Sequence, residues 1–135
     1  RVDRRQRQMC IRDRLSALII AQRYQDKTGA VGFEWENVAQ SMDKVDEELG
    51  ELKQAIKNND LNNIEEEIGD LLITIVNLAR FFDISADLAL KKTNKKFYRR
   101  FNFIEKIVKK NNQKIEEISL AELLNYWEEA KNEEK

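Results

Sequence analysis

The chain has 135 residues, of which 36% are charged, and its 24 basic and 25 acidic side chains leave a formal net charge of -1. This length fits a single domain with one core, and the balanced charge excludes a strong overall attraction to nucleic acid polymers or to membranes. The sequence has no histidine, which excludes imidazole zinc sites, Ser-His triads and Glu-x-x-His di-iron sites. It has no proline and only four glycines, which favours long helices.

The composition also limits the partners and the compartment. No apolar run approaches the roughly 20 residues that cross a bilayer, and a single cysteine provides no disulfide framework. We therefore expect a cytoplasmic protein that binds neither a membrane nor a nucleic acid polymer. The usual glycine-rich phosphate-binding loops are missing from the sequence. Any bound phosphate is therefore expected to be held by a metal ion and by cationic side chains.

The first 14 residues, RVDRRQRQMCIRDR, are strongly basic and include the only cysteine. Residues 4–13 resemble the translation of a common transposon-derived sequencing adaptor. We interpret residues 1–14 as an adaptor-derived artefact and residues 15–135 as the functional domain. The alternative is a basic helical extension or a nucleic-acid-binding arm. The artefact interpretation leaves open whether the natural protein continues upstream of Leu15.

Apolar periodicity predicts an all-α fold that begins with three helices. A short amphipathic helix runs from about Leu15 to about Gly29, and a loop follows it. The second helix ends in a turn at residues 57–63, and the third runs from about Ile64 to about Phe82. The apolar stripe of the second helix repeats at spacings of 4, 3 and 4 residues, at Val45, Leu49, Leu52 and Ile56. The short turn predicts an antiparallel hairpin.

Two further helices are predicted downstream. Ser85 is a candidate N-cap before the fourth helix, whose apolar positions are Leu90, Phe97, Phe101, Ile104 and Val108. The last helix opens at Ser119, which forms a capping box with Glu122. We expect four to five helices to pack as a bundle in which the central hairpin carries the functional residues.

Four carboxylates lie on matching flanks of this hairpin. On a helical wheel Glu48 lies about 70° from the apolar stripe of the second helix, with Glu51 further round on the same side, whereas Glu47 points about 170° away. Glu67 and Asp70 lie on the flank of the same hand of the third helix. Flanks of equal hand meet on one side of an antiparallel pair. We therefore expect Glu48, Glu51, Glu67 and Asp70 to converge.

Converging carboxylates repel one another unless a cation neutralises them. Mg²⁺ prefers oxygen ligands and keeps room for water and phosphate, so the pattern predicts a half-exposed magnesium site that recruits a polyphosphate. The alternative is that the acidic runs are solvated helix faces or form surface ion pairs. Such pairs contribute only about 0–1 kcal/mol each and do not require two matched flanks.

The segments KVDEELGE at 44–51 and EIGD at 67–70 resemble the E-x-x-E and E-x-x-D signature of the MazG-type nucleoside triphosphate pyrophosphohydrolases. Similarity is closest to the second, catalytic domain of two-domain MazG proteins, which strengthens the expectation that an N-terminal domain was lost at the adaptor junction. Further similar segments are AQR (21–23), VGFEW (31–35), VNLAR (76–80), AL (89–90), NKKFYRRF (94–101) and NYW (125–127). Arg23 departs from the lysine that is common at its position.

The resemblance implies a function and a set of roles. It implies that Glu48, Glu51, Glu67 and Asp70 hold Mg²⁺, that Lys44, Lys96 and Arg100 contact the triphosphate, and that Trp127 stacks on or flanks the base. The implied reaction is hydrolysis of a nucleoside triphosphate to a nucleoside monophosphate and pyrophosphate, in which a metal-activated water attacks the α-phosphorus.

Several of these roles have simpler interpretations from the residues alone. Trp127 continues the apolar stripe of the last helix and is then a core residue. Lys96 and Arg100 have the i, i+4 spacing of ordinary surface cations. Glu47 is a candidate general base because it adjoins Glu48, but its outward direction argues against that role unless a second subunit packs there.

Two other functions compete with the pyrophosphohydrolase hypothesis. One is a non-catalytic helical dimerisation or regulatory module whose acidic face binds a basic partner, and four intact carboxylates argue against it. The other is a phosphohydrolase that releases inorganic phosphate. We expect a homodimer, because several amphipathic stripes on a domain this small leave apolar surface that one layer cannot cover. Base preference and the choice between dimer and tetramer stay open.

Overall fold

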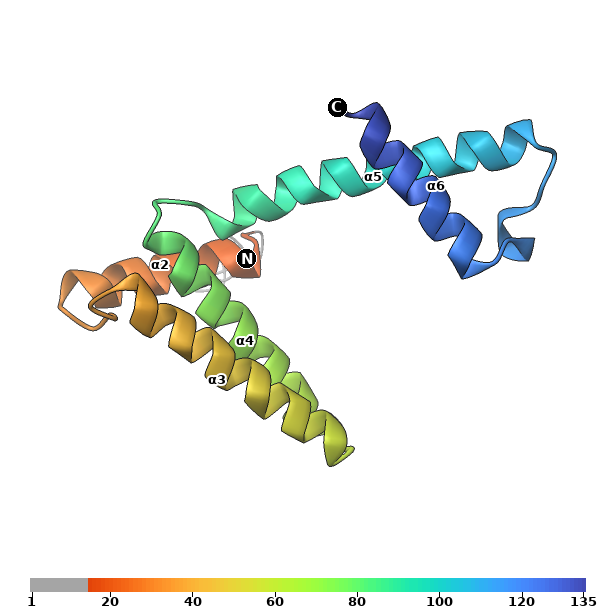
Figure 1. Cartoon of the computed structure of the whole chain (residues 1–135). Coiled ribbons are helices and arrows are strands. Elements are labelled where there is room, and N and C mark those ends of the chain that lie inside the picture. The colour runs from red at the N-terminus through yellow and green to blue at the C-terminus, as the bar shows by residue number, and fades with distance from the viewer. Residues whose placement is uncertain (1–14) are drawn as a thin grey trace, which may run out of the picture. The chain divides into compact units, whose positions relative to one another are not determined.

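The computed structural model describes residues 15–135. Within this range every regular secondary-structure element is a helix (Figure 1). The helices are α2 (Ala17–Ala30), α3 (Val38–Lys57), α4 (Leu61–Arg80), α5 (Ala86–Lys110) and α6 (Leu120–Glu133), with the 3₁₀ helix η1 (Ile115–Glu117) before α6. The predicted all-α class is confirmed. The interpretation of residues 1–14 as adaptor sequence lies outside the described residues.

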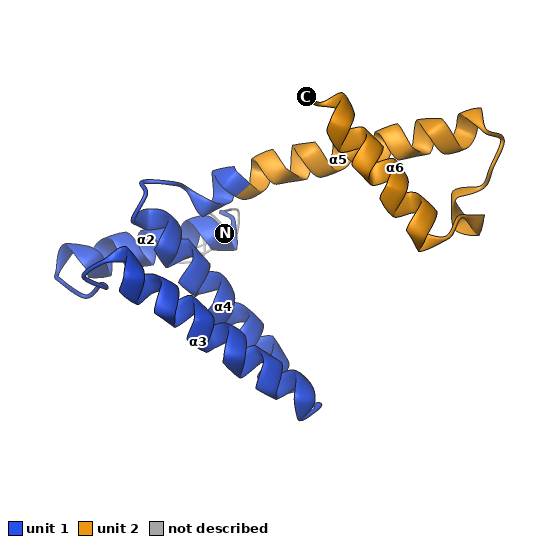
Figure 2. Ribbon diagram, in the orientation of Figure 1, with its two compact units in different colours: residues 1–89 blue, residues 90–135 orange. Residues whose placement is uncertain are grey.

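The chain divides into two compact units, residues 1–89 and residues 90–135 (Figure 2). The first unit contains α2, α3, α4 and the beginning of α5, and the second contains the rest of α5, η1 and α6. The four carboxylates singled out in the sequence belong to the first unit. Lys96, Arg100 and Trp127 belong to the second. Among residues 15–135, no helix has both the length and the apolar character that a bilayer crossing requires.

Short polar side chains begin each of the five α-helices. In every case the side-chain oxygen accepts a hydrogen bond from the backbone N–H three residues later, which satisfies a donor that the first turn of a helix leaves free. These residues are Ser16, Asn37, Asp60, Ser85 and Ser119. The predicted caps Ser85 and Ser119 are confirmed.

Helices α3 and α4 form the predicted antiparallel hairpin (Figure 1). Its turn is shorter than predicted, because α3 continues to Lys57 and α4 begins at Leu61. Asn59 has a positive φ of 54°, a conformation that asparagine adopts more readily than most residues and that ends α3. Asp60 then caps α4, so the asparagines at 62 and 63 lie in its first turn and not in the loop.

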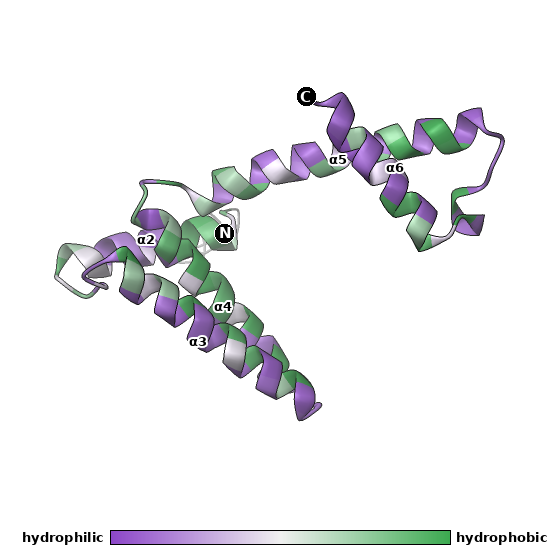
Figure 3. Ribbon diagram, in the orientation of Figure 1, coloured by the Kyte–Doolittle hydropathy of each residue, from purple (hydrophilic) through white to green (hydrophobic). Residues whose placement is uncertain are grey.

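Both apolar and polar contacts hold the first unit together. Ala55 and Val76 are buried, and Figure 3 shows the second half of α4 as largely hydrophobic. Across the hairpin the Ser41 hydroxyl donates to Asn77 Oδ1 at 3.3 Å. Helix α2 packs against α4, where Gln25 Nε2 donates to the backbone carbonyl of Ile73 at 2.9 Å. The hairpin and α2 thus form one packed body.

Candidate metal centre

Three carboxylates from the two arms of the hairpin meet in the first unit. Glu48 comes from α3, and Glu67 and Asp70 come from α4. One carboxylate oxygen of each lies within 4.8 Å of the others. The i, i+3 spacing places Glu67 and Asp70 on one side of α4, and the antiparallel pairing turns Glu48 toward the same side. The expected convergence is therefore observed for these three residues.

Glu51 lies at the border of this cluster. It follows Glu48 by one turn on the same side of α3 and is exposed. Its negative charge reaches the cluster, because it helps to raise the pKa of Glu67. The structure thus places Glu51 beside the three converging carboxylates and more open to solvent than they are.

Two buried oxygens of the cluster lack hydrogen-bond partners among the described residues. The Glu48 side chain is only 8% exposed. Glu48 Oε2 and Glu67 Oε2 are buried atoms for which residues 15–135 provide no hydrogen-bond partner. Burying an ionised oxygen is unfavourable unless a hydrogen bond or an opposite charge compensates it. A divalent cation coordinated by both oxygens would provide that compensation.

The pKa values of the Glu48 and Glu67 carboxyls are shifted in opposite directions. The pKa of Glu67 is raised to about 7, first because burial disfavours the charged form and then because Glu51, Glu48 and Asp70 add negative charge. The pKa of Glu48 is lowered, mainly because Lys44 donates a hydrogen bond to it. At neutral pH Glu67 is therefore about half protonated, whereas Glu48 is charged.

Lys44 closes one side of the cluster. Its Nζ lies 3.0 Å from Glu48 Oε1 and 3.3 Å from Glu47 Oε1. The hydrogen bond to Glu48 also raises the pKa of Lys44, so this ammonium stays charged. The Glu47 side chain is 56% exposed, in keeping with its predicted outward direction. Lys44 thus links Glu47 to Glu48.

A cavity of about 480 Å³ adjoins this cation in the first unit. Its walls come from α2, the segment 31–37, α3 and α4, and Lys44, Thr74 and Asn77 are among its polar residues. Sequence analysis missed the α2 residues of this cavity, among them Gln25. A weak signal was present, because Tyr24, Gln25 and Thr28 have the spacing of one helix face.

An ion pair anchors the segment that forms the cavity's aromatic wall. Arg80 Nε lies 2.8 Å from Asp26 Oδ1, and Arg80 Nη2 lies 3.6 Å from Glu34 Oε2. Gly29 leaves room for this contact, since a Cβ atom there would lie 2.6 Å from Glu34 Oε2 and 2.9 Å from Arg80 Nη2. The position of the neighbouring Phe33 and Trp35 thus depends on Arg80.

The second unit contains Lys96, Arg100 and Trp127, the other residues singled out in the sequence. Arg100 is 13% exposed in its side chain, and its Nη2 lies 3.0 Å from Glu134 Oε2. The guanidinium carbon lies 5.5 Å from the ring centroid of Trp127, which is 5.2 Å from that of Phe97. Lys96 is half-buried and helps to lower the pKa of Glu134, an effect that arises mainly from Arg100. Arg100 and Trp127 thus join α5 to α6.

The helical hairpin and its carboxylate cluster define an all-α protein with a candidate divalent-metal centre. Residues 36–104, just over half of the chain, match the MazG nucleotide pyrophosphohydrolase domain. This segment includes all of the converging carboxylates and Lys44. The chain therefore belongs to the MazG family, which confirms the resemblance seen in the sequence.

Individual relatives support this assignment. The chain is 42% identical over 115 residues to the nucleoside triphosphate pyrophosphohydrolase/pyrophosphatase MazG of Thermotoga maritima, a match that covers 85% of this chain and 44% of that protein. It is 39% identical over 124 residues to the nucleoside triphosphate pyrophosphohydrolase of Escherichia coli K12, covering 89% and 46%. The chain thus spans slightly less than half the length of these two relatives.

Proposed function

We propose that the chain is a magnesium-dependent enzyme that hydrolyses nucleoside triphosphates to nucleoside monophosphates and pyrophosphate. The observation that carries this proposal is the convergence of Glu48, Glu67 and Asp70 inside the segment that matches the family. Two relatives at 39–42% identity are named for this activity. Because the chain spans less than half of each, its own activity needs a direct test.

The residues of the cluster fit a hard divalent cation. Carboxylate oxygens are the ligands that Mg²⁺ prefers, and two buried oxygens of Glu48 and Glu67 lack partners among the described residues. Glu48, Glu67 and Asp70 would hold the ion, with Glu51 at the border as the fourth ligand. Magnesium supplies positive charge for the triphosphate and makes a water more acidic. Glu67 must release its proton before it can act as a charged ligand.

The cationic residues would position the triphosphate. Lys44 is held beside the cluster by Glu48 and presents a fixed positive charge for a phosphate oxygen. The family resemblance adds Lys96 and Arg100 as triphosphate contacts and Trp127 as a base contact, roles that require Arg100 to exchange its Glu134 partner for the nucleotide.

In the proposed reaction water attacks the α-phosphorus, and the bond from that phosphorus to the bridging oxygen breaks. Pyrophosphate leaves with the bridging oxygen, and the monophosphate keeps the oxygen of the water. A proton of the water must be accepted during the attack. Glu47 is the proposed acceptor because it adjoins Glu48 and because its Oε1 lies 3.3 Å from the Lys44 Nζ that also contacts Glu48.

The apolar surface supports a homodimer. Large apolar side chains on α4 and α5 are exposed to a degree that is unusual for core-forming positions. They include Ile68, Leu72, Ile75, Phe97 and Phe101. A second copy of the chain would remove this surface from water.

One product analysis tests the proposed reaction. The protein is incubated with ATP, GTP, CTP and UTP in turn, with and without Mg²⁺, and nucleotides, pyrophosphate and phosphate are resolved by chromatography. Monophosphate and pyrophosphate in equal amounts, abolished by chelation and restored by excess Mg²⁺, support the proposal. A diphosphate with inorganic phosphate would indicate the other regiochemistry. Absence of turnover with all four nucleotides would favour the non-catalytic module.

A further inference from the structure

The segment 31–37, between α2 and α3, is attached to the first unit at both of its ends. At its start the backbone N–H of Phe33 donates to the carbonyl oxygen of Thr28 at 2.9 Å. At its end the backbone N–H of Glu36 donates to Gln40 Oε1 at 2.8 Å. Phe33 is 79% exposed, so the burial of this large apolar side chain contributes little to holding the segment in place.

The middle of the segment borders two cavities. Glu34 and Trp35 line the cavity of about 480 Å³ beside Lys44. They also line a smaller cavity of about 300 Å³, whose wall includes Arg80. A segment that borders open space in two cavities is held less by close packing than an element of the core. Its position therefore depends on specific contacts.

Arg80 provides such a contact to the middle of the segment. Its Nε lies 2.8 Å from Asp26 Oδ1 on α2, and this bond orients the guanidinium. Its Nη2 then lies 3.6 Å from Glu34 Oε2 in the segment. The Arg80 side chain is 18% exposed, so water screens these ion pairs less than it screens fully exposed ones. Because Arg80 is the last residue of α4, it joins the segment to both helices.

Gly29 leaves the space that this contact needs. A Cβ atom at this position would lie 2.6 Å from Glu34 Oε2 and 2.9 Å from Arg80 Nη2. Both atoms are the far ends of flexible side chains, so Gly29→Ala would displace them and leave the backbone in place. Gly29 lies in the last turn of α2, and alanine favours a helix more than glycine does. This substitution should therefore break the contact without weakening the helix.

We propose that Arg80, acting through Glu34, is a positioning residue that holds the segment 31–37 in place for substrate binding. The proposal rests on the proposed function for the identity of the substrate. A nucleotide whose phosphates contact Lys44 borders the cavity that this segment lines. The carboxylates of the proposed metal centre lie on α3 and α4, outside the segment. Loss of the Arg80 contact therefore weakens binding and leaves the chemical step unchanged.

Steady-state kinetics separate binding from chemistry. When the segment is held in only a fraction of the molecules, the apparent affinity for the substrate falls by that fraction. We expect Gly29→Ala and Arg80→Gln each to raise KM roughly 10-fold for the nucleotide that is hydrolysed fastest, and to keep kcat within about twofold. Gly50→Ala is the matched control, because Gly50 is also helical and a Cβ atom there meets nothing within 4 Å. It should change neither constant.

Fluorescence follows the segment without any turnover. The chain has two tryptophans, so Trp35 is the remaining one in a Trp127→Phe background. Without nucleotide, Gly29→Ala and Arg80→Gln should raise the acrylamide quenching constant of Trp35 at least about twofold, because a released segment exposes the indole more often. Gly50→Ala should leave this constant unchanged.

A double substitution tests the route from Arg80 to the segment. If Arg80 acts through Glu34, then Glu34→Gln combined with Arg80→Gln should raise KM no more than Arg80→Gln alone. Effects of the two substitutions that multiply would mean that the residues act independently, and this result would refute the route.

The outcomes separate this inference from the proposed function. Unchanged KM and unchanged quenching in Gly29→Ala overturn the role of Arg80, and so does a fall in kcat at constant KM. Gly29→Ala alters no charge, so the test holds even when Arg80→Gln fails to fold. If the protein hydrolyses none of the four nucleotides and Gly29→Ala still frees Trp35, the hold of Arg80 on the segment stands and the proposed function falls.

Discussion

The carboxylate cluster of the first unit and the Arg100–Glu134 cluster of the second differ in how their charges are compensated. In the second unit Arg100 pairs with Glu134 and lies over Trp127, so opposite charges and an aromatic face compensate one another. In the first unit Glu48, Glu67 and Asp70 face one another, and Lys44 contacts Glu48 from one side of the cluster.

The difference indicates which cluster serves packing and which serves a ligand. A paired cluster lowers the free energy of the fold as it stands, as the lowered pKa of Glu134 reflects. A cluster of like charges raises the free energy of the fold, and the raised pKa of Glu67 reflects this repulsion. An arrangement that is unfavourable alone persists when it has another use, so perturbed carboxyls of this kind mark candidate functional sites.

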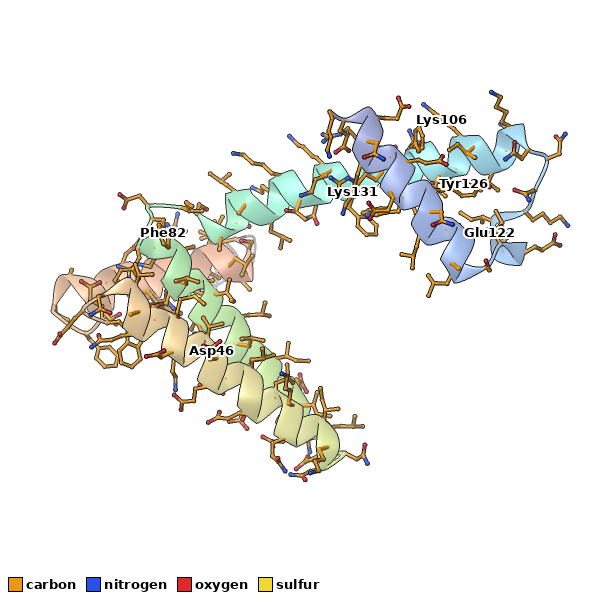
Figure 4. The ribbon with its side chains drawn as sticks, in the orientation of Figure 1. Asp46, Phe82, Lys106, Glu122, Tyr126 and Lys131 are labelled. Carbon is orange, nitrogen blue, oxygen red and sulfur yellow. The ribbon has the colours of Figure 1, made fainter. Side chains whose placement is uncertain are left out.

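The largest expected effect comes from neutralising a ligand in the first unit. Glu48→Gln and Asp70→Asn should each lower kcat by at least about 100-fold, because each removes one charged oxygen from the proposed metal centre while the helix packing stays intact. Circular dichroism and steady-state kinetics measure the fold and the loss. The control is Asp46→Asn on α3, an exposed carboxylate outside the cluster (Figure 4). Full activity in both variants would rule out the assignment of the ligands.

The second effect concerns assembly, because both units expose apolar side chains. We expect the chain to be a homodimer whose activity falls on dilution, measured by light scattering and by activity across a dilution series. A fully active monomer at low concentration would refute the dimer.

Mixing inactive Glu67→Gln with inactive Arg100→Ala sharpens the comparison. Recovered activity would mean that the two clusters serve shared sites, and no recovery would favour sites complete in each subunit.

A smaller effect is expected on stability, with opposite sign in the two clusters. In metal-free protein Glu134→Gln should lower the melting temperature by a few degrees at neutral pH, because it removes a charge that Arg100 stabilises. Glu67→Gln should raise it at alkaline pH. Because the pKa of Glu67 is raised in the folded protein, its protonation stabilises the fold at pH values below 4.5, the ordinary pKa of a glutamate. This contribution to the free energy of unfolding is lost as the pH rises through about 7. Calorimetry with a chelator present measures both. Equal destabilisation by the two substitutions would contradict the contrast.

Proton release on metal binding is a further consequence of the same pKa. Near pH 6 Glu67 holds its proton in the free protein, so binding of Mg²⁺ should release about one proton, and near pH 8.5 almost none. Titration calorimetry in two buffers of different ionisation enthalpy counts the protons. Release that persists in Glu67→Gln would assign the proton to another group.

The smallest effect is expected at the N-terminus. Deleting residues 1–14 should leave the melting temperature and kcat unchanged, because the segment resembles translated adaptor sequence and includes none of the residues assigned to the proposed site. Thermal unfolding and kinetics of the full and shortened chains test this directly. A large loss of stability or activity would show that the segment belongs to the functional protein.

The fold could largely be predicted from the sequence, and the site in part. Apolar spacing located all five α-helices, and the flank argument brought Glu48, Glu67 and Asp70 together, because both depend on helix geometry and on a short turn. The start of α4 was predicted three residues late. The asparagines around Asp60 suit a turn as well as a capped first turn, and only the backbone conformation distinguishes these states.

The sequence by itself determined the helical class, the hairpin, the family and the side of the hairpin on which the carboxylates meet. All of these follow from patterns that are local in the chain. Only the tertiary structure decided that Glu48 is buried while Glu51 is exposed, that Gln25 reaches Ile73 from 48 residues away, and that Arg100 pairs with Glu134 from 34 residues away. Burial and pairing of this kind depend on how separate helices pack, and a periodic pattern within one helix carries no information about the partner that will cover it.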